Sequence, residues 1–197
     1  FTAVCRDRQV PVALKVMGRH NVLNAMVALA VADENGVPLD AAVQALEQFT
    51  GFQNRQQIME KDGITVIDDT YNASPVSMIA GLEVLHSMEK AGRRIAVLAD
   101  MKELGPEGPS FHREVGAYLA AEPVDGLITF GPLAVSMAQG AQEQAEKSGR
   151  ALFVRSFGEE EREEMHAFLK EFLQEGDAVL FKGSNSMRLG ETAKLFL

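Results

Sequence analysis

Short apolar runs alternate with amphipathic segments along most of the chain, from about residue 62 to its end. Five of these runs are rich in aliphatic and β-branched residues and predict buried strands, at residues 64–67, 95–98, 126–130, 151–154 and 178–181. The segments between them repeat apolar residues at helical spacing and predict helices. Because this alternation is typical of βαβ units, we predict a doubly wound α/β domain with a mostly parallel sheet over residues 62–197.

Several of the predicted helices have recognisable ends or faces. Ser74 and Pro75 indicate a helix start, because serine caps a first turn and proline fits the first helical position. The stripe Met165, Phe168, Leu169 and Phe172 predicts a helix whose apolar face joins the core. The remaining helices are expected at about 109–121, up to about 147, and at the end of the chain.

Residues 1–58 follow a different pattern. Residues 9–17 partly alternate and predict a strand, while residues 21–34 and 40–49 predict two helices. We therefore expect a mostly helical region that does not complete a sheet by itself.

Composition and charge exclude several classes of partner. The chain has 197 residues, of which 46% are hydrophobic, and a formal net charge of -9, which repels nucleic acid. Cys5 is the single cysteine, so no internal disulfide forms, as is typical of a reducing cytosol. No apolar run approaches the roughly 18 residues of a membrane helix. We therefore expect a cytoplasmic protein without nucleic-acid or membrane partners, and the opening on Phe1 rather than Met predicts a longer polypeptide.

Polar residues gather directly after the predicted strands, where ligands bind in open parallel sheets. The three polar loops are Asp68-Asp69-Thr70-Tyr71-Asn72, Asp100-Met-Lys102-Glu103-Leu-Gly105 and Lys182-Gly183-Ser184. Adjacent carboxylates suit a ribose diol or a Mg²⁺ shell, and strand geometry turns only one of them toward a ligand. The alternative is a helix cap with a solvated turn.

Two further groups of residues predict anion and nucleotide contacts. Lys182, Gly183 and Ser184 offer an ammonium, backbone N–H groups and a hydroxyl to a carboxylate or phosphate, unless they form only a capped helix with a surface lysine. Asn21 and Asn24 share a helix face and suit the edge of an adenine, unless one of them is merely a cap. Neither G-x-x-x-x-G-K-[ST] nor G-x-G-x-x-G occurs in the sequence. We therefore expect the chain to bind the non-phosphate end of a nucleotide, or a second substrate.

The order and spacing of these motifs resemble those of the Mur ligases, nearly end to end. The motifs are Arg19-His20-Asn21-x-x-Asn24-Ala25, Asn54-Arg55, Asp68-Asp69-Thr70-Tyr71-Asn72-Ala73-Ser74-Pro75, Leu98-Ala-Asp100-Met-x-Glu103-Leu-Gly105 and Lys182-Gly183-Ser184-Asn185-Ser186-Met187. Within the family they are most similar to the members that add D-Ala-D-Ala. The resemblance implies that residues 1–58 are the C-terminal piece of the central ATP-binding domain, and that residues 62–197 are the C-terminal Rossmann-like domain.

The same resemblance implies an activity. The intact protein would use ATP and Mg²⁺ to activate UDP-N-acetylmuramoyl-tripeptide as an acyl phosphate, which the amine of D-Ala-D-Ala attacks during peptidoglycan precursor synthesis. The family's phosphate loop and metal ligands are expected upstream of Phe1, so no metal ligand is assigned here and this chain alone is expected to be inactive. The full-length protein is expected to be a monomer.

The resemblance also implies roles for individual residues. Asn21 and Asn24 would lie near the adenine and its ribose, and His20 would support the catalytic site. Arg55 would contact the nucleotide phosphates, and Asp69 would bind the ribose. The D-Ala-D-Ala contacts would come from Tyr71, Asn72, Lys182 and Ser184, with the catalytic-site residue Lys182 near the carboxylate.

Two other interpretations remain open at this point. Another Mur ligase or a folylpolyglutamate synthase would share the fold and differ in its acceptor. A non-catalytic nucleotide- or peptide-binding module would explain why the chain has no phosphate loop.

Overall fold

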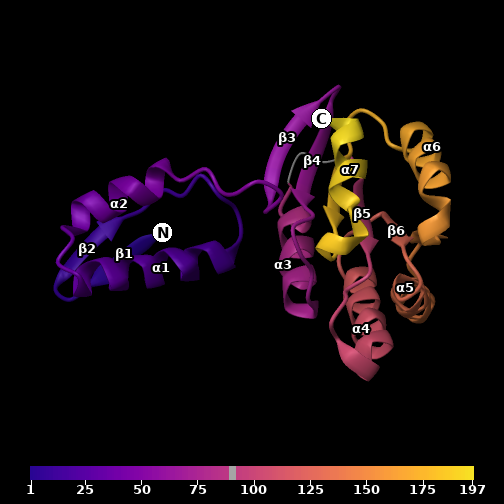
Figure 1. Ribbon diagram of the computed structural model, residues 1–197, viewed down its shortest axis with the longest axis horizontal. Coiled ribbons are helices and arrows are strands. Elements are labelled where there is room, and N and C mark those ends of the chain that lie inside the picture. The colour runs from indigo at the N-terminus through magenta and orange to yellow at the C-terminus, as the bar shows by residue number, and fades with distance from the viewer. Residues whose placement is uncertain (89–91) are drawn as a thin grey trace. The chain divides into compact units, whose positions relative to one another are not determined.

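The computed structural model describes residues 1–88 and 92–197. These residues form two compact units, Phe1–Phe52 and Gln53–Leu197, each of which is described by itself (Figure 1). The expected boundary lay near residue 58. The boundary falls earlier because the strand Gln57–Lys61 pairs with the strand that follows it and so belongs to the second unit.

The first unit packs two helices against a β-hairpin. Its elements are β1 (Thr2–Cys5), β2 (Arg8–Pro11), α1 (Arg19–Glu34) and α2 (Leu39–Gln48). The two predicted helices are confirmed. The predicted strand over residues 9–17 is wrong in its second half, because β2 pairs back on β1 through a tight turn and ends at Pro11.

Helix α1 carries apolar residues on its outer as well as its inner face. Leu29 packs in the small core of this unit, whereas Leu23, Val27 and Val31 are 57%, 65% and 57% exposed. An ordinary surface helix keeps its outer face polar. Apolar residues on both faces, as in α1, are typical of a helix that is buried on both sides.

The second unit is built on one mixed sheet. In the described residues its strand order is β3-β4-β8-β5-β6-β7, and only the β3–β4 pair is antiparallel. The strands are β3 (Gln57–Lys61), β4 (Ile64–Asp69), β5 (Arg94–Ala99), β6 (Gly126–Phe130), β7 (Phe153–Phe157) and β8 (Ala178–Lys182). The helices are α3 (Pro75–His86), α4 (Gly108–Ala121), α5 (Ala134–Ser148), α6 (Arg162–Phe172) and the short α7 (Leu189–Ala193). The predicted doubly wound α/β fold with a mostly parallel sheet is confirmed.

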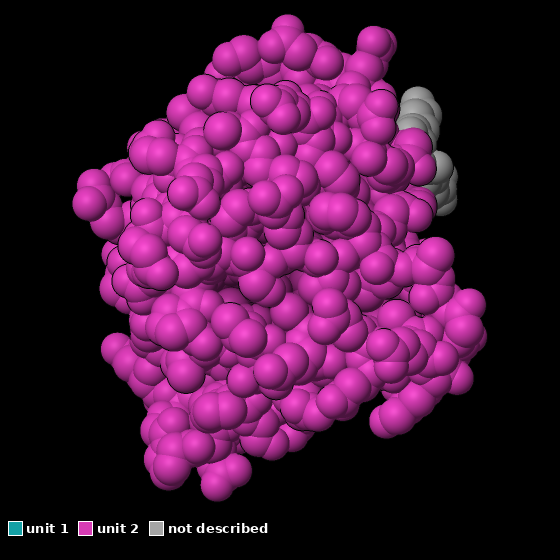
Figure 2. All heavy atoms as spheres, turned by 90° about the vertical axis from the view of Figure 1, so that its right-hand side faces the viewer, with its two compact units in different colours: residues 1–52 teal, residues 53–197 magenta. Residues whose placement is uncertain are grey.

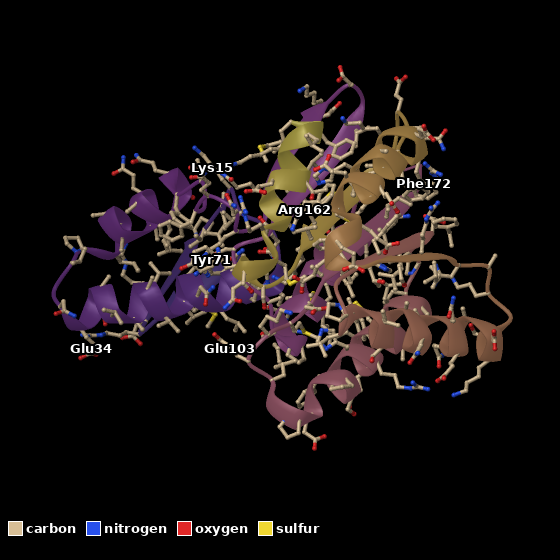
Figure 3. All side chains as sticks on the ribbon, turned by 45° about the vertical axis from the view of Figure 1, so that its right-hand side comes forward. Lys15, Glu34, Tyr71, Glu103, Arg162 and Phe172 are labelled. Atoms are coloured by element: carbon tan, nitrogen blue, oxygen red, sulfur yellow. The ribbon has the colours of Figure 1, made fainter. Side chains whose placement is uncertain are left out.

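Helices cover both faces of this sheet (Figure 1). Along β5, Ala96 and Leu98 pack with α3, α4 and α5, while Ile95, Val97 and Ala99 pack with α6 and α7. Successive side chains of a strand point to opposite faces, so a continuously apolar strand supplies both cores. Figure 2 shows one face of this closely packed unit. In Figure 3, Arg162 and Phe172 mark the two ends of α6.

The chain reverses its direction of travel across the sheet after β7. Helices α3, α4 and α5 lead outward from β4 to β5, β6 and β7, whereas α6 returns the chain to β8, between β4 and β5. Right-handed crossovers in opposite directions place their helices on opposite faces. The strand ends beside β8 are therefore where such sheets bind ligands.

Local signals explain most of the element bounds. Ser74 accepts a hydrogen bond from Ser77 N and Pro75 is the first residue of α3, as predicted. The strand predicted at 151–154 lies two residues later, because its pairing with β6 begins at Phe153. The predicted C-terminal helix is short, and a 3₁₀ turn, Lys194–Phe196, follows it. Strand β3 was not predicted, since its polar sequence shows no apolar run.

Close packing of α4 against α5 generates a first prediction. A Cβ atom on Gly116 would overlap the carbonyl oxygen of Met137, and one on Gly140 would overlap that of Arg113. We expect Gly116→Ala to destabilise the chain by about 1–3 kcal/mol, because the helix backbones must separate. Thermal unfolding followed by circular dichroism measures this.

The matched control is Gly108→Ala, at the start of α4, where a Cβ would meet Leu104 only at 3.8 Å. That variant should melt at or slightly above the wild-type temperature, because alanine favours helix. Equal melting temperatures for the two variants would contradict the close approach of α4 and α5.

Candidate functional site

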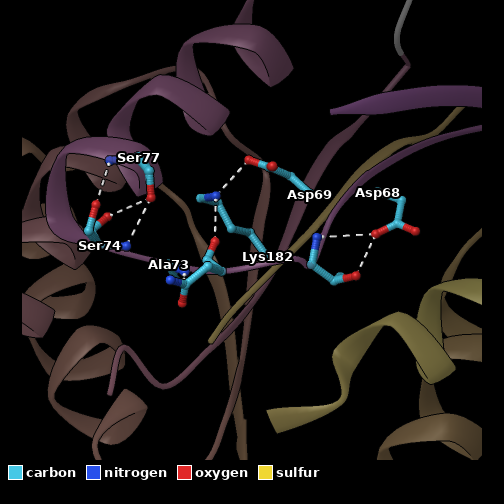
Figure 4. A network of polar contacts seen from close by, with 8 residues as sticks. Asp68, Asp69, Ala73, Ser74, Ser77 and Lys182 are labelled. Atoms are coloured by element: carbon cyan, nitrogen blue, oxygen red, sulfur yellow. Dashed lines mark hydrogen bonds and ion pairs between the residues drawn. The ribbon is translucent and has the colours of Figure 1, made fainter. Parts of the chain in front are cut away.

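A buried ion pair joins the carboxyl ends of β4 and β8. The Lys182 ammonium donates to Asp69 Oδ2 at 2.6 Å and to the carbonyl oxygen of Asn72 at 3.0 Å (Figure 4). The Lys182 side chain is 3% exposed and that of Asp69 is 10% exposed. Gly81 of α3 leaves room for it, since a Cβ there would lie 3.2 Å from Lys182 Cδ. The pair therefore ties the loop after β4 to the central strand.

Asp68 faces the other side of β4, as strand geometry predicts (Figure 4). Its Oδ1 accepts hydrogen bonds from Thr70 N at 3.2 Å and Thr70 Oγ1 at 2.6 Å. Asn54 Nδ2 donates to the same Thr70 hydroxyl at 3.2 Å. Asp68 therefore orders the loop, while Asp69 belongs to the ion pair.

Arg55 and Tyr71 are neighbours at this edge. The Arg55 guanidinium lies over the Tyr71 ring, 3.9 Å from its centre, and Tyr71 is 47% exposed. Figure 3 labels Tyr71 in the loop that follows β4. Tyr71 N also donates to Asn54 O at 2.9 Å. The side chain of Asn72 turns back on the chain, where its Oδ1 accepts from Ala73 N at 2.9 Å.

The loops after β5, β6 and β8 share a second network. Buried Asp100 accepts from Ala134 N, at the start of α5, at 2.7 Å and from Lys102 Nζ at 2.9 Å. This bond to Asp100 raises the pKa of the Lys102 ammonium. Ser184 N donates to Asp100 O at 3.0 Å, and Ser184 Oγ accepts from Lys102 N at 2.8 Å. The Ser184 hydroxyl therefore keeps its own proton to donate to a ligand.

His112 anchors this network from inside α4, and sequence reasoning missed it. It is fully buried, accepts from Met101 N at Nε2 over 2.9 Å, and contacts Gly108 O through Nδ1 at 2.7 Å. These partners require a neutral ring with its proton on Nδ1. Burial lowers the pKa of His112 below its ordinary value. A lone histidine in a helical segment carries no spacing signal that would single it out.

The other predicted residues lie in the first unit. Asn21 Nδ2 donates to Met17 O at 2.6 Å, and Asn24 Nδ2 donates to Asn21 Oδ1 at 3.4 Å, so the two amides share one face as predicted. The His20 ring folds back over Gly18, where a Cβ atom would lie 2.5 Å from His20 Cε1. The structure thus brings together Asp69, Asn72 and Lys182, and describes His20, Asn21 and Asn24 in a separate unit.

Within residues 1–88 and 92–197, no group of three or more histidine, cysteine, aspartate or glutamate side chains is arranged to hold a metal ion. No helix in the same ranges combines the length and apolarity needed to cross a bilayer.

The parallel sheet with polar loops at the carboxyl ends of its strands is typical of ligand-binding α/β proteins. Comparison with known families identifies the family. Residues 54–185 match the family described as Mur ligase, glutamate ligase domain. The chain belongs to the Mur ligase family. A relative from Bacillus subtilis (strain 168), a UDP-N-acetylmuramoyl-tripeptide–D-alanyl-D-alanine ligase, is 34% identical over 92% of this chain and 38% of its own length. A ligase of the same name from Mycobacterium tuberculosis is 36% identical over 98% of this chain and 41% of its own length.

Solved structures of the same kind of ligase share the fold. A crystal structure of MurF from Acinetobacter baumannii has a TM-score of 0.84 and 30% identity, covering 100% of this chain and 41% of that one. MurF from Thermotoga maritima in complex with ADP has a TM-score of 0.76 and 28% identity, covering 96% of this chain and 41% of that one. This chain therefore spans about two fifths of the length of these relatives.

The buried ion pair generates a second prediction. Lys182→Met removes the ammonium from the buried Asp69 carboxylate and should lower the free energy of unfolding by about 3–5 kcal/mol. Adding Asp69→Asn removes the buried negative charge and should recover part of that loss. Urea unfolding at pH 7.5 measures both variants.

The matched control breaks the half-exposed ion pair of Arg113 with Glu143. Arg113→Met should change the stability by less than about 1 kcal/mol, because exposed pairs contribute little. A Lys182→Met protein as stable as the control variant would contradict the buried pair.

His112 generates a third prediction, on pH. Because its pKa is lower in the folded chain than its ordinary value of about 6.5, the unfolded chain binds a proton first as the pH falls. The contribution of His112 to stability is complete above pH 6.5 and is lost as the pH falls toward the lowered pKa. His112→Gln should flatten the fall in stability between pH 7.5 and 5.5.

Proposed function

We propose that this chain is the C-terminal portion of an ATP-dependent ligase that joins D-Ala-D-Ala to UDP-N-acetylmuramoyl-tripeptide. The observation that carries the proposal is the 34–36% identity, over more than nine tenths of the chain, to relatives that bear this name. Residues 1–52 would then belong to the central ATP-binding domain and residues 53–197 to the C-terminal domain. The intact protein would work as a cytoplasmic monomer in peptidoglycan precursor synthesis.

The reaction has two steps. The terminal phosphoryl group of ATP passes to the tripeptide carboxylate, forming an acyl phosphate and ADP. The amine of D-Ala-D-Ala then attacks the acyl carbon, phosphate leaves, and the amine proton passes to solvent or a base. Mg²⁺ would supply charge neutralisation at the phosphates, and its ligands are expected outside this chain. Positioning and exclusion of water are the contributions open to the residues described here.

Nucleotide contacts are assigned within each unit by itself. In the second unit Asp69, held by Lys182, binds the ribose, and Arg55 offers guanidinium donors to phosphate oxygens. In the first unit the amides of Asn21 and Asn24 read the adenine, and His20 supports the catalytic site. ADP in the related Thermotoga maritima structure supports a nucleotide for this chain as well.

Dipeptide contacts come from the strand ends around β8. The Ser184 hydroxyl, already an acceptor from Lys102 N, donates to the D-Ala-D-Ala carboxylate. Asn72 offers its side-chain amide from the exposed loop after β4. Lys182 donates to Asp69 and to Asn72 O, which leaves one of its three ammonium N–H donors for the carboxylate. Its constant contribution is to hold Asp69 in place.

The test of this function, and a fourth prediction, uses the full-length protein that carries this chain. Phosphate release should require ATP, UDP-N-acetylmuramoyl-tripeptide and D-Ala-D-Ala together, and glutamate or single amino acids should not replace the dipeptide. Asp69→Asn should raise the KM for ATP about tenfold, the equivalent of one lost charged hydrogen bond of about 1.4 kcal/mol. The exposed β3 variant Glu60→Gln serves as the control and should keep the wild-type KM.

Two results would contradict the proposal. Phosphate release with glutamate in place of the dipeptide would assign the protein to another ligase of the fold. Tight nucleotide binding without any ligation would assign it to the non-catalytic modules.

A further inference from the structure

The segment that carries Arg55 opens the second unit in an unusual backbone conformation. Asn54 and Gln56, on either side of it, have positive φ angles of 59° and 49°. Residues other than glycine adopt this region uncommonly, although asparagine does so more readily than most. The contacts of Asn54 hold the start of this segment in place.

Those contacts come from the loop after β4. Asn54 donates through Nδ2 to Thr70 Oγ1 at 3.2 Å and accepts at its carbonyl oxygen from Tyr71 N at 2.9 Å. Asn54 N donates to Gln57 Oε1 at 3.2 Å. The Thr70 hydroxyl in turn donates to Asp68 Oδ1 at 2.6 Å. The backbone beside Arg55 is thus fixed to the strand end that also carries Asp69.

The guanidinium of Arg55 is held by stacking alone. It lies 3.9 Å from the centre of the Tyr71 ring, and within the described part of the chain it makes no hydrogen bond or ion pair. A planar guanidinium that rests on an aromatic face keeps its N–H donors around its edge. The donors of Arg55 are therefore oriented but unused.

Tyr71 lies in the chain between the residues that contact Lys182 and the residues that hold Arg55. Its neighbour Asn72 supplies the carbonyl oxygen that binds Lys182, and its own ring and N–H hold the Arg55 segment. A substitution at Tyr71 therefore changes the contacts of Arg55 directly. It leaves Ser184 unaffected, because Ser184 belongs to the separate network of Asp100 and Lys102.

We propose that Tyr71 is a positioning residue for Arg55, holding its guanidinium ready for an anion of the nucleotide, rather than a contact for D-Ala-D-Ala. This inference rests on the proposed function. It moves Tyr71 from the dipeptide contacts to the nucleotide contacts. Tyr71 acts through Arg55 and touches no reacting atom.

The kinetic test is a fifth prediction, made on the full-length ligase. Tyr71→Leu removes the aromatic face and should raise the KM for ATP about two- to fivefold, as expected for loss of one exposed cation–π contact, with the KM for D-Ala-D-Ala unchanged. Tyr71→Phe keeps the ring and should restore the KM for ATP. In the Arg55→Ala background, Tyr71→Leu should have no further effect on the KM for ATP.

Opposite kinetic results would overturn the inference. A raised KM for D-Ala-D-Ala with an unchanged KM for ATP would return Tyr71 to the dipeptide. Multiplying effects of Arg55→Ala and Tyr71→Leu would show that the two residues act independently. Failure of the Phe variant to restore the KM for ATP would show that the hydroxyl, not the ring, is what matters.

A second measurement needs no ligation and so separates this inference from the proposed function. The chain has no tryptophan and two tyrosines, so in the Tyr118→Phe variant Tyr71 is the only strongly fluorescent residue. Arg55→Ala should increase quenching of its fluorescence by acrylamide about twofold, because the covered ring face becomes accessible. Unchanged quenching would overturn the stacking and the inference with it, whether or not the full-length protein ligates. Increased quenching in a protein without ligation would leave the stacked pair standing and remove only the proposed reaction.

Discussion

The candidate site depends on one buried charge pair, that of Lys182 with Asp69. A carboxylate at the end of a buried strand cannot remain ionised in place without a partner, because removing it from water is costly. Lys182 supplies that partner from the neighbouring parallel strand and also fixes the carbonyl oxygen of Asn72. The pair fixes the loop after β4 at Asn72, while Asp68 fixes it at Thr70. The same loop holds Tyr71, and the Tyr71 ring in turn holds the Arg55 guanidinium.

Three strand ends are joined into a continuous polar edge by two networks of different character. The network around Asp69 is charged and joins β4 to β8. The network around Asp100 uses backbone N–H groups, a serine hydroxyl and the neutral ring of His112 to join β5, β8 and the start of α5. Among the described residues Arg94 Nε is the one buried side-chain donor without a hydrogen-bond partner, and it belongs to neither network. The edge is therefore ordered by contacts within the chain itself.

The sequence predicted the fold well, since the parallel strands are buried on both faces and so appear as continuous apolar runs. It did not predict β3, whose residues Gln57, Glu60 and Lys61 resemble a loop and form a strand only because β4 offers a free edge. The motifs directed attention to the ends of β4, β5 and β8, where the structure describes the two hydrogen-bonded networks. Contacts between residues far apart in the sequence could not be predicted, because no local sequence pattern shows that Lys182 pairs with Asp69 or that Arg55 stacks on Tyr71. The role of His112 was equally invisible, as it arises from a loop that folds over α4.

The place of β8 in the sheet has a consequence for how the chain is made. Among the described residues this strand is the last along the chain, yet it lies between β4 and β5, and its register pairs Asp69 with Lys182, 113 positions apart. Until β8 has been synthesised, β4 and β5 lack the strand they share and present apolar, unpaired edges. Contacts of such long range also close slowly. A chain that stopped before β8 would therefore leave the facing edges of β4 and β5 open to chaperones or to pairing with a wrong strand.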